Sequence, residues 1–216
     1  MPLPFNDGQV GSSQEVNHDF SAWTGGAGAS VVLASPHHGS YAFLIDSATD
    51  NEYYAWGVAT TDGYIRAMVY FTSLPTSGNT VVVFDLWAIT YSDPRLLVKN
   101  NAGTMQIGVR ANDGTTAFVN YPFVTGTWYC LELGYVQSTK TVTAYVSGVS
   151  QVSKACANTD TMSRGYIGWT ATAAQMYVDC VVMDDAFIGC DTEIGGGLSV
   201  PVAMHHYSIL MNGGQG

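Results

Sequence analysis

Apolar and polar residues alternate in short runs along most of this chain, and Gly, Asn, Asp and Ser stand between the runs. The clearest alternation lies at 80–91, which predicts a strand with two different faces. One face is apolar and holds Val82, Phe84, Leu86 and Ala88. The other mixes aromatic residues with a carboxylate and holds Val81, Val83, Asp85, Trp87, Ile89 and Tyr91. This second composition is expected where one face of a sheet is partly solvated.

Comparable runs elsewhere predict an all-β chain. Short strands separated by turn signals every 8–12 residues or so are typical of a sandwich or barrel, and no segment predicts a helix. Two hairpins are expected, one turning at 100–103 and one at 137–140, and Asp113-Gly114 begins another pairing. Further strands are predicted at 27–34, 41–46, 52–58, 63–71 and 166–169. The apolar run at 175–188 predicts a closing strand buried on both faces.

The two ends of the chain differ from this central region. Residues 1–18 contain two prolines and show no periodicity, so we expect an N-terminal arm, followed by one domain at 19–190. Residues 191–216 contain three consecutive glycines and the apolar stretch LSVPVAMHHYSILM. An exposed apolar tail is unfavourable for a free monomer, so we expect it to dock on its own domain or on a neighbour. A homo-oligomer held by the terminal arms is therefore predicted.

The charge and hydropathy of the sequence argue against nucleic-acid and membrane partners. The formal net charge is −10, and the seven Lys and Arg residues are scattered along the sequence, so nucleic-acid binding is not expected. No run approaches the roughly 18 apolar residues that a membrane span needs, and the N-terminus lacks the features of a secretion signal. We therefore expect no membrane insertion.

The four cysteines, Cys130, Cys156, Cys180 and Cys190, show no spacing typical of a zinc site. Four cysteines allow three fully paired connectivities. Without a visible signal peptide, reduced and buried thiols are the default expectation. Maturation outside a reducing cytosol would favour disulfides instead.

Three pieces of the sequence together resemble a known family. They are HDFSAW with SPHHGSYAFLID, GTWYCLELGY with TVTAYVSG, and GYIGW with MYVDCVVMDDAFIG. In this order they resemble the laminin-G-like, concanavalin A-like lectin and glucanase jelly rolls over about residues 19–190. The resemblance implies two stacked antiparallel sheets, with ligands on a concave face or its rim. It also implies that Trp128 packs in the core and that Asp179 matches the first of a pair of aspartates, where Cys180 replaces the second.

Catalysis is not expected from the arrangement of acidic residues. Retaining glycanases need two carboxyl groups about 5–5.5 Å apart. The four glutamates are isolated in the sequence, and the adjacent Asp184 and Asp185 should point to opposite faces of a strand. A lyase would need a histidine with a Tyr or Arg, but His37-His38 and His205-His206 lie in an expected loop and tail, where neighbouring histidines are more often turn or interface residues than catalysts. We therefore predict a protein that is not an enzyme, with a glycanase or polysaccharide lyase as the less favoured alternative.

Two binding sites are predicted. Calcium is held by carboxylates in many proteins of this fold class, and the candidate ligands are Asp19, Asp179, Asp184 and Asp185, which could instead be solvated edge residues. A glycan needs exposed aromatic faces and a few polar groups. The preferred ligand-binding face consists of Asp85, Trp87, Tyr91 and Arg95. Tyr53, Tyr54 and Trp56 form a second aromatic group, and ordinary packing is the alternative for each of these residues.

These features favour a binding or coating module over an enzyme. We expect a surface-displayed lectin-like jelly roll that contacts glycans or capsid proteins, as a decoration, fibre or tail component of a phage or virus particle. Its location would then be the virion surface or another extracellular site. The alternative is a carbohydrate-binding module of a secreted glycan-degrading system.

Overall fold

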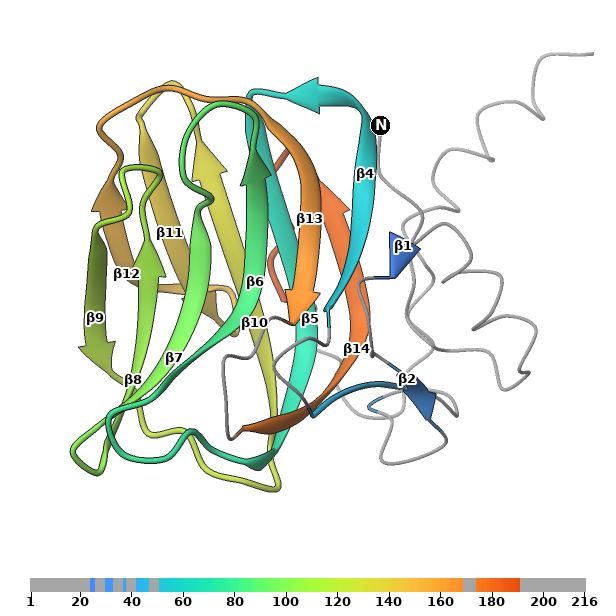
Figure 1. Cartoon of the computed structure of the whole chain (residues 1–216), viewed down its shortest axis with the longest axis vertical. Helices are drawn as coiled ribbons and strands as arrows, with labels where there is room; N and C mark the ends of the chain where they lie inside the picture. The colour runs from blue at the N-terminus through green and yellow to red at the C-terminus, as the bar shows by residue number, and fades with distance from the viewer. Residues whose placement is uncertain are drawn as a thin grey trace, which may run out of the picture.

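The chain folds into two antiparallel sheets of seven strands each, packed face to face (Figure 1). The computed structural model describes residues 24–25, 30–32, 37, 42–46, 51–168 and 174–190. No helix occurs among these residues, so none of them forms a helical membrane span. The predicted all-β, two-sheet antiparallel sandwich is confirmed. The arms at 1–18 and 191–216, and Asp19, lie outside the described residues.

The first sheet forms the front layer in Figure 1. Its strands lie in the order β1, β4, β13, β6, β7, β8 and β9, and all neighbouring pairs are antiparallel. Their bounds are Thr24–Gly25, Asn51–Thr60, Met162–Gly168, Thr80–Ala88, Arg95–Asn101, Thr104–Arg110 and Thr116–Asn120. The predicted turn at 100–103 joins β7 to β8 and contains Ala102 and Gly103, both with positive φ. Gly103 adopts such a conformation at little cost because it has no Cβ.

The second sheet lies behind the first, in the order β12, β11, β10, β5, β14, β3 and β2. The bounds are Val149–Ala155, Thr141–Val146, Trp128–Val136, Asp62–Ser73, Gln175–Asp184, Ala42–Ile45 and Ser30–Val32. β12 was not predicted from the sequence. Side chains from both sheets fill the space between them, and the largest fully buried ones include Tyr135, Phe71, Phe84 and Leu86.

A β-bulge in β6 changes which of its residues face the core, so the predicted faces of this strand need correction. The register between β6 and β7 shifts between Val82 and Phe84. As a result Val81 and Val83 are core residues together with Phe84 and Leu86, whereas Val82 is half-buried. A bulge inserts one residue and so reverses the alternation on one side of it. The prediction was therefore wrong for the valines, but it placed Asp85 and Trp87 on one face correctly.

The prediction for the late apolar run also needs correction. β14 ends at Asp184 rather than near Ile188, and it lies inside the sheet, between β5 and β3. Its burial alternates at Tyr177 and Val182, which are half-buried, so it is not buried on both faces throughout. A register shift between Asp179 and Val182 surrounds Cys180, whose φ of 54° is positive.

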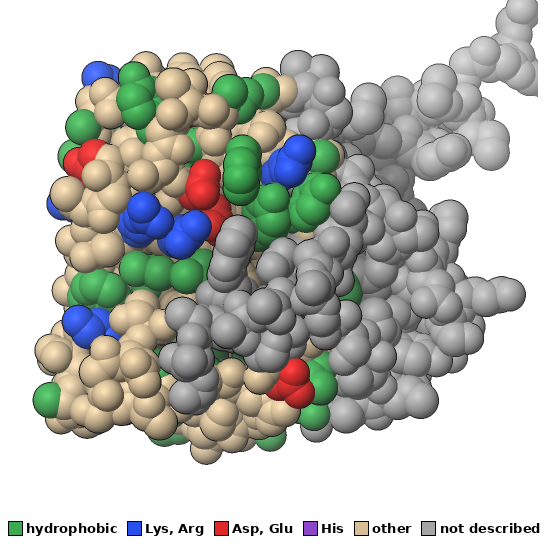
Figure 2. Space-filling model, in the orientation of Figure 1, with side chains coloured by type: hydrophobic (Ala, Val, Ile, Leu, Met, Phe, Trp, Pro, Cys, Tyr) green, Lys and Arg blue, Asp and Glu red, His purple; other side chains and the backbone are tan. Residues whose placement is uncertain are grey.

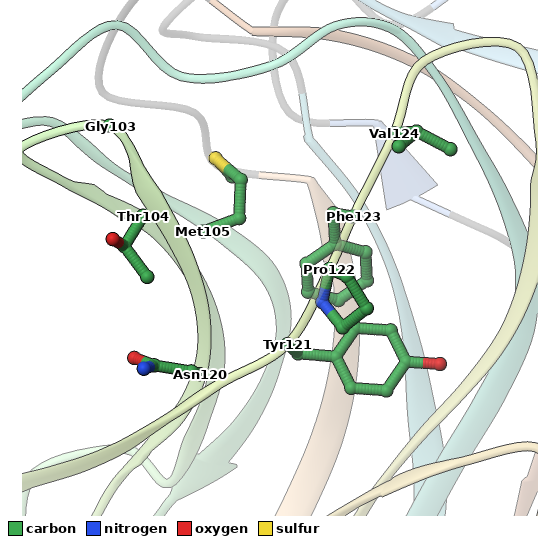
Figure 3. Close-up of a pocket in the computed structure, with 8 residues that line it drawn as sticks. All are labelled: Gly103, Thr104, Met105, Asn120, Tyr121, Pro122, Phe123 and Val124. Atoms are coloured by element: carbon green, nitrogen blue, oxygen red, sulfur yellow. The ribbon is translucent and has the colours of Figure 1, made fainter.

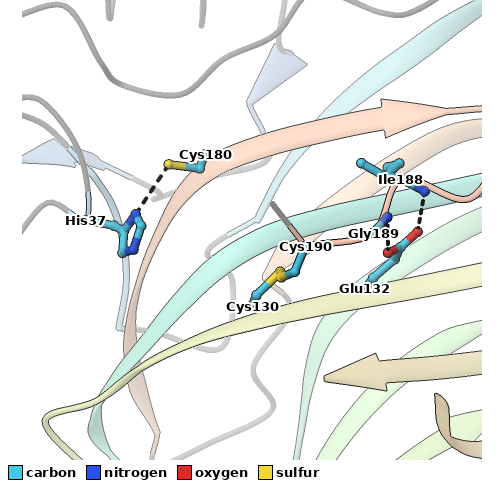
Figure 4. Close-up of a disulfide and its surroundings, with 7 residues drawn as sticks. All are labelled: His37, Cys130, Glu132, Cys180, Ile188, Gly189 and Cys190. Carbon is cyan, nitrogen blue, oxygen red and sulfur yellow. Dashed lines mark hydrogen bonds between the residues drawn. A yellow bond between two sulfur atoms is a disulfide. The ribbon is translucent and has the colours of Figure 1, made fainter. Parts of the chain in front are cut away.

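After β14 the chain returns across the outer face of the second sheet, in a segment that we call the strap, residues 185–190 (Figure 4). The Glu132 carboxylate accepts hydrogen bonds from the Ile188 and Gly189 amides at 2.9 and 3.0 Å. Cys190 forms a disulfide with Cys130, with a Cα–Cα distance of 6.2 Å. The expectation of reduced thiols is thus wrong for this pair, whereas Cys156 and Cys180 are buried and take no part in this disulfide, and Cys180 Sγ lies 3.7 Å from His37 Nδ1.

Candidate functional site

A row of aromatic and charged residues crosses the outer face of the first sheet. In the strand register Tyr53 on β4 lies opposite Tyr166 on β13, which lies opposite Asp85 on β6. Asp85 is paired in turn with Arg95 on β7, and Arg95 with Arg110 on β8. Adjacent strands are about 4.8 Å apart, so the row extends over about 20 Å. Five strands therefore bring together residues that are distant in the sequence.

The aromatic end of the row is a continuous platform, which we define as Tyr53, Tyr166, Trp87 and Arg164. The Tyr53 and Tyr166 ring centroids are 4.9 Å apart, and those of Trp87 and Tyr166 are 5.9 Å apart. Arg164 lies opposite Trp87 in the register, and its guanidinium carbon is 4.9 Å from the Tyr53 centroid and 5.8 Å from that of Trp87. A guanidinium over aromatic rings is stabilised by the ring quadrupoles. The platform thus combines flat apolar rings with a positive charge.

Asp85 and Arg95 form the centre of the row. The Arg95 Nε lies 2.7 Å from Asp85 Oδ2, and the Asp85 side chain is 0% exposed. Arg95 Nη2 also lies 3.5 Å from Asp93 Oδ2. Burial raises the pKa of Asp85 to about 7, although the positive charge of Arg95 opposes the shift. Burial also raises the pKa of Asp93. A carboxylate is costly in such an environment because desolvation disfavours its charged form.

Further cations continue the row toward β8. Arg110 is close enough for its charge to lower the pKa values of both Asp85 and Asp93. Lys99 lies on β7 two residues beyond Leu97, and its Nζ is 5.2 Å from the ring centroid of Phe118. Figure 2 views this face directly and shows Lys and Arg side chains beside acidic and apolar ones. The exposed surface of the sheet is therefore mixed in chemistry, with cations on both sides of the Asp85 carboxylate.

The structure brings three of the four predicted ligand-binding residues together on this face: Asp85, Trp87 and Arg95. Trp87 is 37% exposed, as a binding platform requires. Tyr91 lies beyond the end of β6, where its amide donates to Asp160 Oδ2 at 2.8 Å, and its side chain is 45% exposed. No aromatic contact joins Tyr91 to Trp87 within the part of the chain that the structure describes. Ligand binding by these residues stays a prediction.

The sequence did not identify Tyr166 and Arg164 as members of the site. They come from β13, which is the neighbour of β6 although about 80 residues separate the two strands. Their alternation, with Arg164 and Tyr166 on the face opposite Gly165 and Ile167, was a readable signal for a shared surface. Tyr53 was part of the second predicted aromatic group, and the side chains of Tyr54 and Trp56 lie outside the described residues.

Three of the four predicted calcium ligands, Asp179, Asp184 and Asp185, lie on or directly after β14 in the second sheet, apart from this face. Asp179 is buried, and its two oxygens accept hydrogen bonds from the His37 amide at 2.8 Å and the Cys180 amide at 2.7 Å. Asp184 accepts from the Asp185 amide at 2.7 Å, and burial raises its pKa. Among the residues described, no three His, Cys, Asp or Glu side chains are arranged to hold a metal ion. Asp19 lies outside them, so calcium stays a prediction.

Glu132 lies on β10 of the second sheet, where its carboxylate holds the strap in place. Both carboxylate oxygens accept backbone hydrogen bonds from the strap, and burial raises its pKa. Arg66 lies opposite it in the strand register and is itself buried. Attachment of the strap therefore accounts for the burial of this carboxylate.

Trp128, predicted to pack in the core, is half-buried on the outer face, where its ring centroid lies 5.3 Å from those of His37 and Tyr70.

A hollow of about 400 Å³ lies at the other end of the first sheet (Figure 3). It is lined by Gly103, Thr104, Met105 and residues 120–124. Because Gly103 follows β7, which begins at Arg95, the hollow is about 20 Å along the strands from the Asp85 row. Tyr121 is its only ionisable side chain, so it offers little polar chemistry. We therefore place the candidate site on the face that carries the row.

Comparison with known proteins supports the fold. No known family model matches this chain, and no curated protein matches it in sequence. Among solved structures, a cellulose-induced protein, Cip1, is similar with a TM-score of 0.59 at 11% identity, covering 80% of this chain and 95% of that one.

Binding domains of botulinum neurotoxins share the same architecture. The receptor-binding domain of neurotoxin D has a TM-score of 0.54 at 9% identity, covering 77% of this chain and 45% of that one. The binding domain of neurotoxin DC in complex with SialylT has a TM-score of 0.54 at 8% identity and covers 77% and 43%. The chain thus spans less than half of these neurotoxin structures. At such identities the likeness shows a common jelly-roll-like sandwich fold.

Proposed function

We propose that this protein is a non-catalytic glycan-binding module, and that the outer face of the first sheet is its binding surface. The observation that carries the proposal is the cluster of the exposed Trp87 ring, the half-buried Tyr53 ring and the buried Tyr166 ring between them, directly beside the Asp85–Arg95 pair. Aromatic rings pack against the apolar C–H faces of sugars, and adjacent polar groups bind hydroxyls.

The fold is consistent with this proposal. A structure with the same sandwich fold was solved in complex with SialylT, and others are described as receptor-binding domains. A non-catalytic role is supported by Glu132, whose carboxylate oxygens both bind backbone amides of the strap. We further propose that the sandwich is of the laminin-G-like, concanavalin A-like type, on the sequence motifs quoted above.

The proposed setting is the surface of a phage or virus particle, as a decoration, fibre or tail component. The low charged fraction of 11% and the apolar stretch LSVPVAMHHYSILM support it. The terminal arms would hold a homo-oligomer or attach the domain to capsid proteins. A carbohydrate-binding module of a secreted glycan-degrading system is the second candidate, and the disulfide between Cys130 and Cys190 favours it because such bonds persist in oxidising compartments.

Binding to a glycan array and to polysaccharide columns tests the proposal, with Trp87→Ala as the variant. Truncating a central aromatic of an interface typically costs about 2 kcal/mol, or roughly thirtyfold in Kd. Phe187→Ala is the matched control, because Phe187 is an exposed aromatic at 49% but lies in the strap, on the second sheet. Equal retention of both variants, with native circular dichroism spectra, would refute the platform as the binding surface.

A further inference from the structure

The cations of this acidic protein are concentrated on the candidate binding face. The whole chain has seven Lys and Arg residues and a net charge of −10. Four of the seven lie on the outer face of the first sheet: Arg95, Lys99, Arg110 and Arg164. This concentration could not be predicted from the sequence, because Arg164 lies on β13, which is distant along the chain from β7 and β8. Antiparallel pairing of β13, β6, β7 and β8 brings these four residues onto one face of the sheet.

Three of these four cations form no ion pair with the acidic residues that the structure describes. Ion pairs within 4 Å join Arg95 to Asp85 and Asp93, but Lys99, Arg110 and Arg164 form none in the described part of the chain. Arg164 instead stacks over Tyr53 and Trp87, and Lys99 lies over Phe118. Among the residues that the structure describes, the ion pairs of this face involve two carboxylates beside four cations, so the described part of the face carries more positive than negative charge.

We infer that the ligand of this face is an acidic glycan, one that carries carboxylate or sulfate groups on its sugars. This inference rests on the proposed function and specifies its ligand class. A guanidinium presents several N–H donors in one plane, which match the two oxygens of a carboxylate. The Arg164 guanidinium lies over the rings of the platform, so a sugar stacked beside it would bring its acidic group within reach of that cation.

The arrangement favours a glycan over other polyanions. Nucleic acids and acidic proteins are attracted by dense clusters of cations, whereas here the cations are spread along about 20 Å of the sheet. The exposed Trp87 ring, which packs against Tyr166 and so lies next to Tyr53, provides an apolar face at one end that suits a pyranose ring. The net charge of −10 opposes non-specific binding of any long polyanion. A ligand must therefore offer both ring faces for stacking and regularly spaced acidic groups.

The test is binding of the full-length chain to polygalacturonate, polysialic acid and chondroitin sulfate, each measured beside its carboxyl-reduced or desulfated form. We expect at least one acidic glycan to bind and its neutralised form to bind at least tenfold more weakly. Arg164→Gln and Arg110→Gln should each weaken that binding about ten- to a hundredfold, as expected for a lost charge-assisted hydrogen bond. Lys140→Gln is the matched control, because Lys140 is exposed in the β10–β11 turn, and it should change the affinity less than twofold.

The outcomes separate this inference from the proposed function. Equal binding of neutralised glycans that is still lost in Trp87→Ala would overturn the acidic preference and leave glycan binding intact. Equal binding of polyglutamate that does not depend on Trp87 would overturn it in favour of an acidic protein partner. If neither the acidic panel nor a neutral glycan array is bound, the proposed function itself fails. Raising the salt from about 0.05 to 0.5 M should weaken the wild-type affinity, because exposed charges are screened.

Discussion

Asp85 should make the stability of this protein fall as the pH rises through neutrality. The carboxyl group is fully buried and has its pKa raised from 3.8 to about 7 by desolvation. In the unfolded chain the same group ionises near its ordinary value, so between these two values the folded state binds more protons. Its contribution to stability is therefore complete below about pH 4 and is lost as the pH rises toward 7. Asp85→Asn removes this titration with little change in shape.

The size of the effect follows from the shift. Each pKa unit corresponds to about 1.4 kcal/mol, so a shift of about three units is worth roughly 4 kcal/mol in total. Part of this is already lost by pH 5, and the linkage relation leaves a decrease of about 3 kcal/mol between pH 5 and pH 8. The direction is opposite to that of a carboxylate held below its usual pKa by hydrogen bonds, such as Asp113 beside Thr115.

Urea denaturation at pH 5, 6, 7 and 8, followed by tryptophan fluorescence, measures this directly. The wild-type free energy of unfolding should decrease across the series, and the decrease should be about 3 kcal/mol smaller in Asp85→Asn. Asp113→Asn is the control, since Asp113 is exposed with a lowered pKa and does not titrate in this range. Parallel profiles for wild type and Asp85→Asn would refute the reasoning, because they would mean that Asp85 is ionised at pH 5 in the folded state.

Two further predictions concern stability away from the Asp85 pair. Reduction of the Cys130–Cys190 disulfide, which links positions 60 residues apart, should cost about 4 kcal/mol and lower Tm by roughly 10 °C. Dithiothreitol should then have no effect on the Cys130→Ser/Cys190→Ser variant in calorimetry, and an equal Tm drop there would contradict this assignment. Gly108→Ala should cost about 1–3 kcal/mol, since its Cβ would meet the Phe118 ring. The same change at Gly165, where the flexible end of Met183 can move, should cost less, and the reverse order in urea denaturation would argue against the packing described.

The fold class could be predicted from the sequence because most strands are specified by local alternation of apolar and polar residues. Alternation at 127–136 and 141–148 and the turn residues between them predicted one hairpin, and the structure has β10 and β11 there. The bulge at Val83 could not be predicted, because the valine run 81–83 is equally apolar on both faces. β12 escaped notice because only Val152 of its residues is buried, so its edge position leaves little apolar pattern.

The candidate site was predictable only in part. Asp85, Trp87 and Arg95 belong to adjacent segments, so alternation and a short turn were enough to place them near one another. Arg164 and Tyr166 required knowledge that β13 inserts between β4 and β6, which is a long-range choice of strand order. The disulfide likewise depends on the return of the strap over β10, which no local signal specifies. What escaped prediction was thus set by contacts between distant segments.

The disulfide of the strap also determines how the domain would respond to mechanical load. A force applied to the C-terminal tail at 191–216 would reach the fold through Cys190 and pass by a covalent bond to Cys130 on β10. β10 is an interior strand, hydrogen-bonded to β5 and β11 along its length, so the load would act on two ladders in shear. Without the bond, the same pull would peel the strap away and then unzip β14 from its end. Cys190, where the load would enter, lies against the second sheet, on the side of the sandwich opposite the candidate binding face.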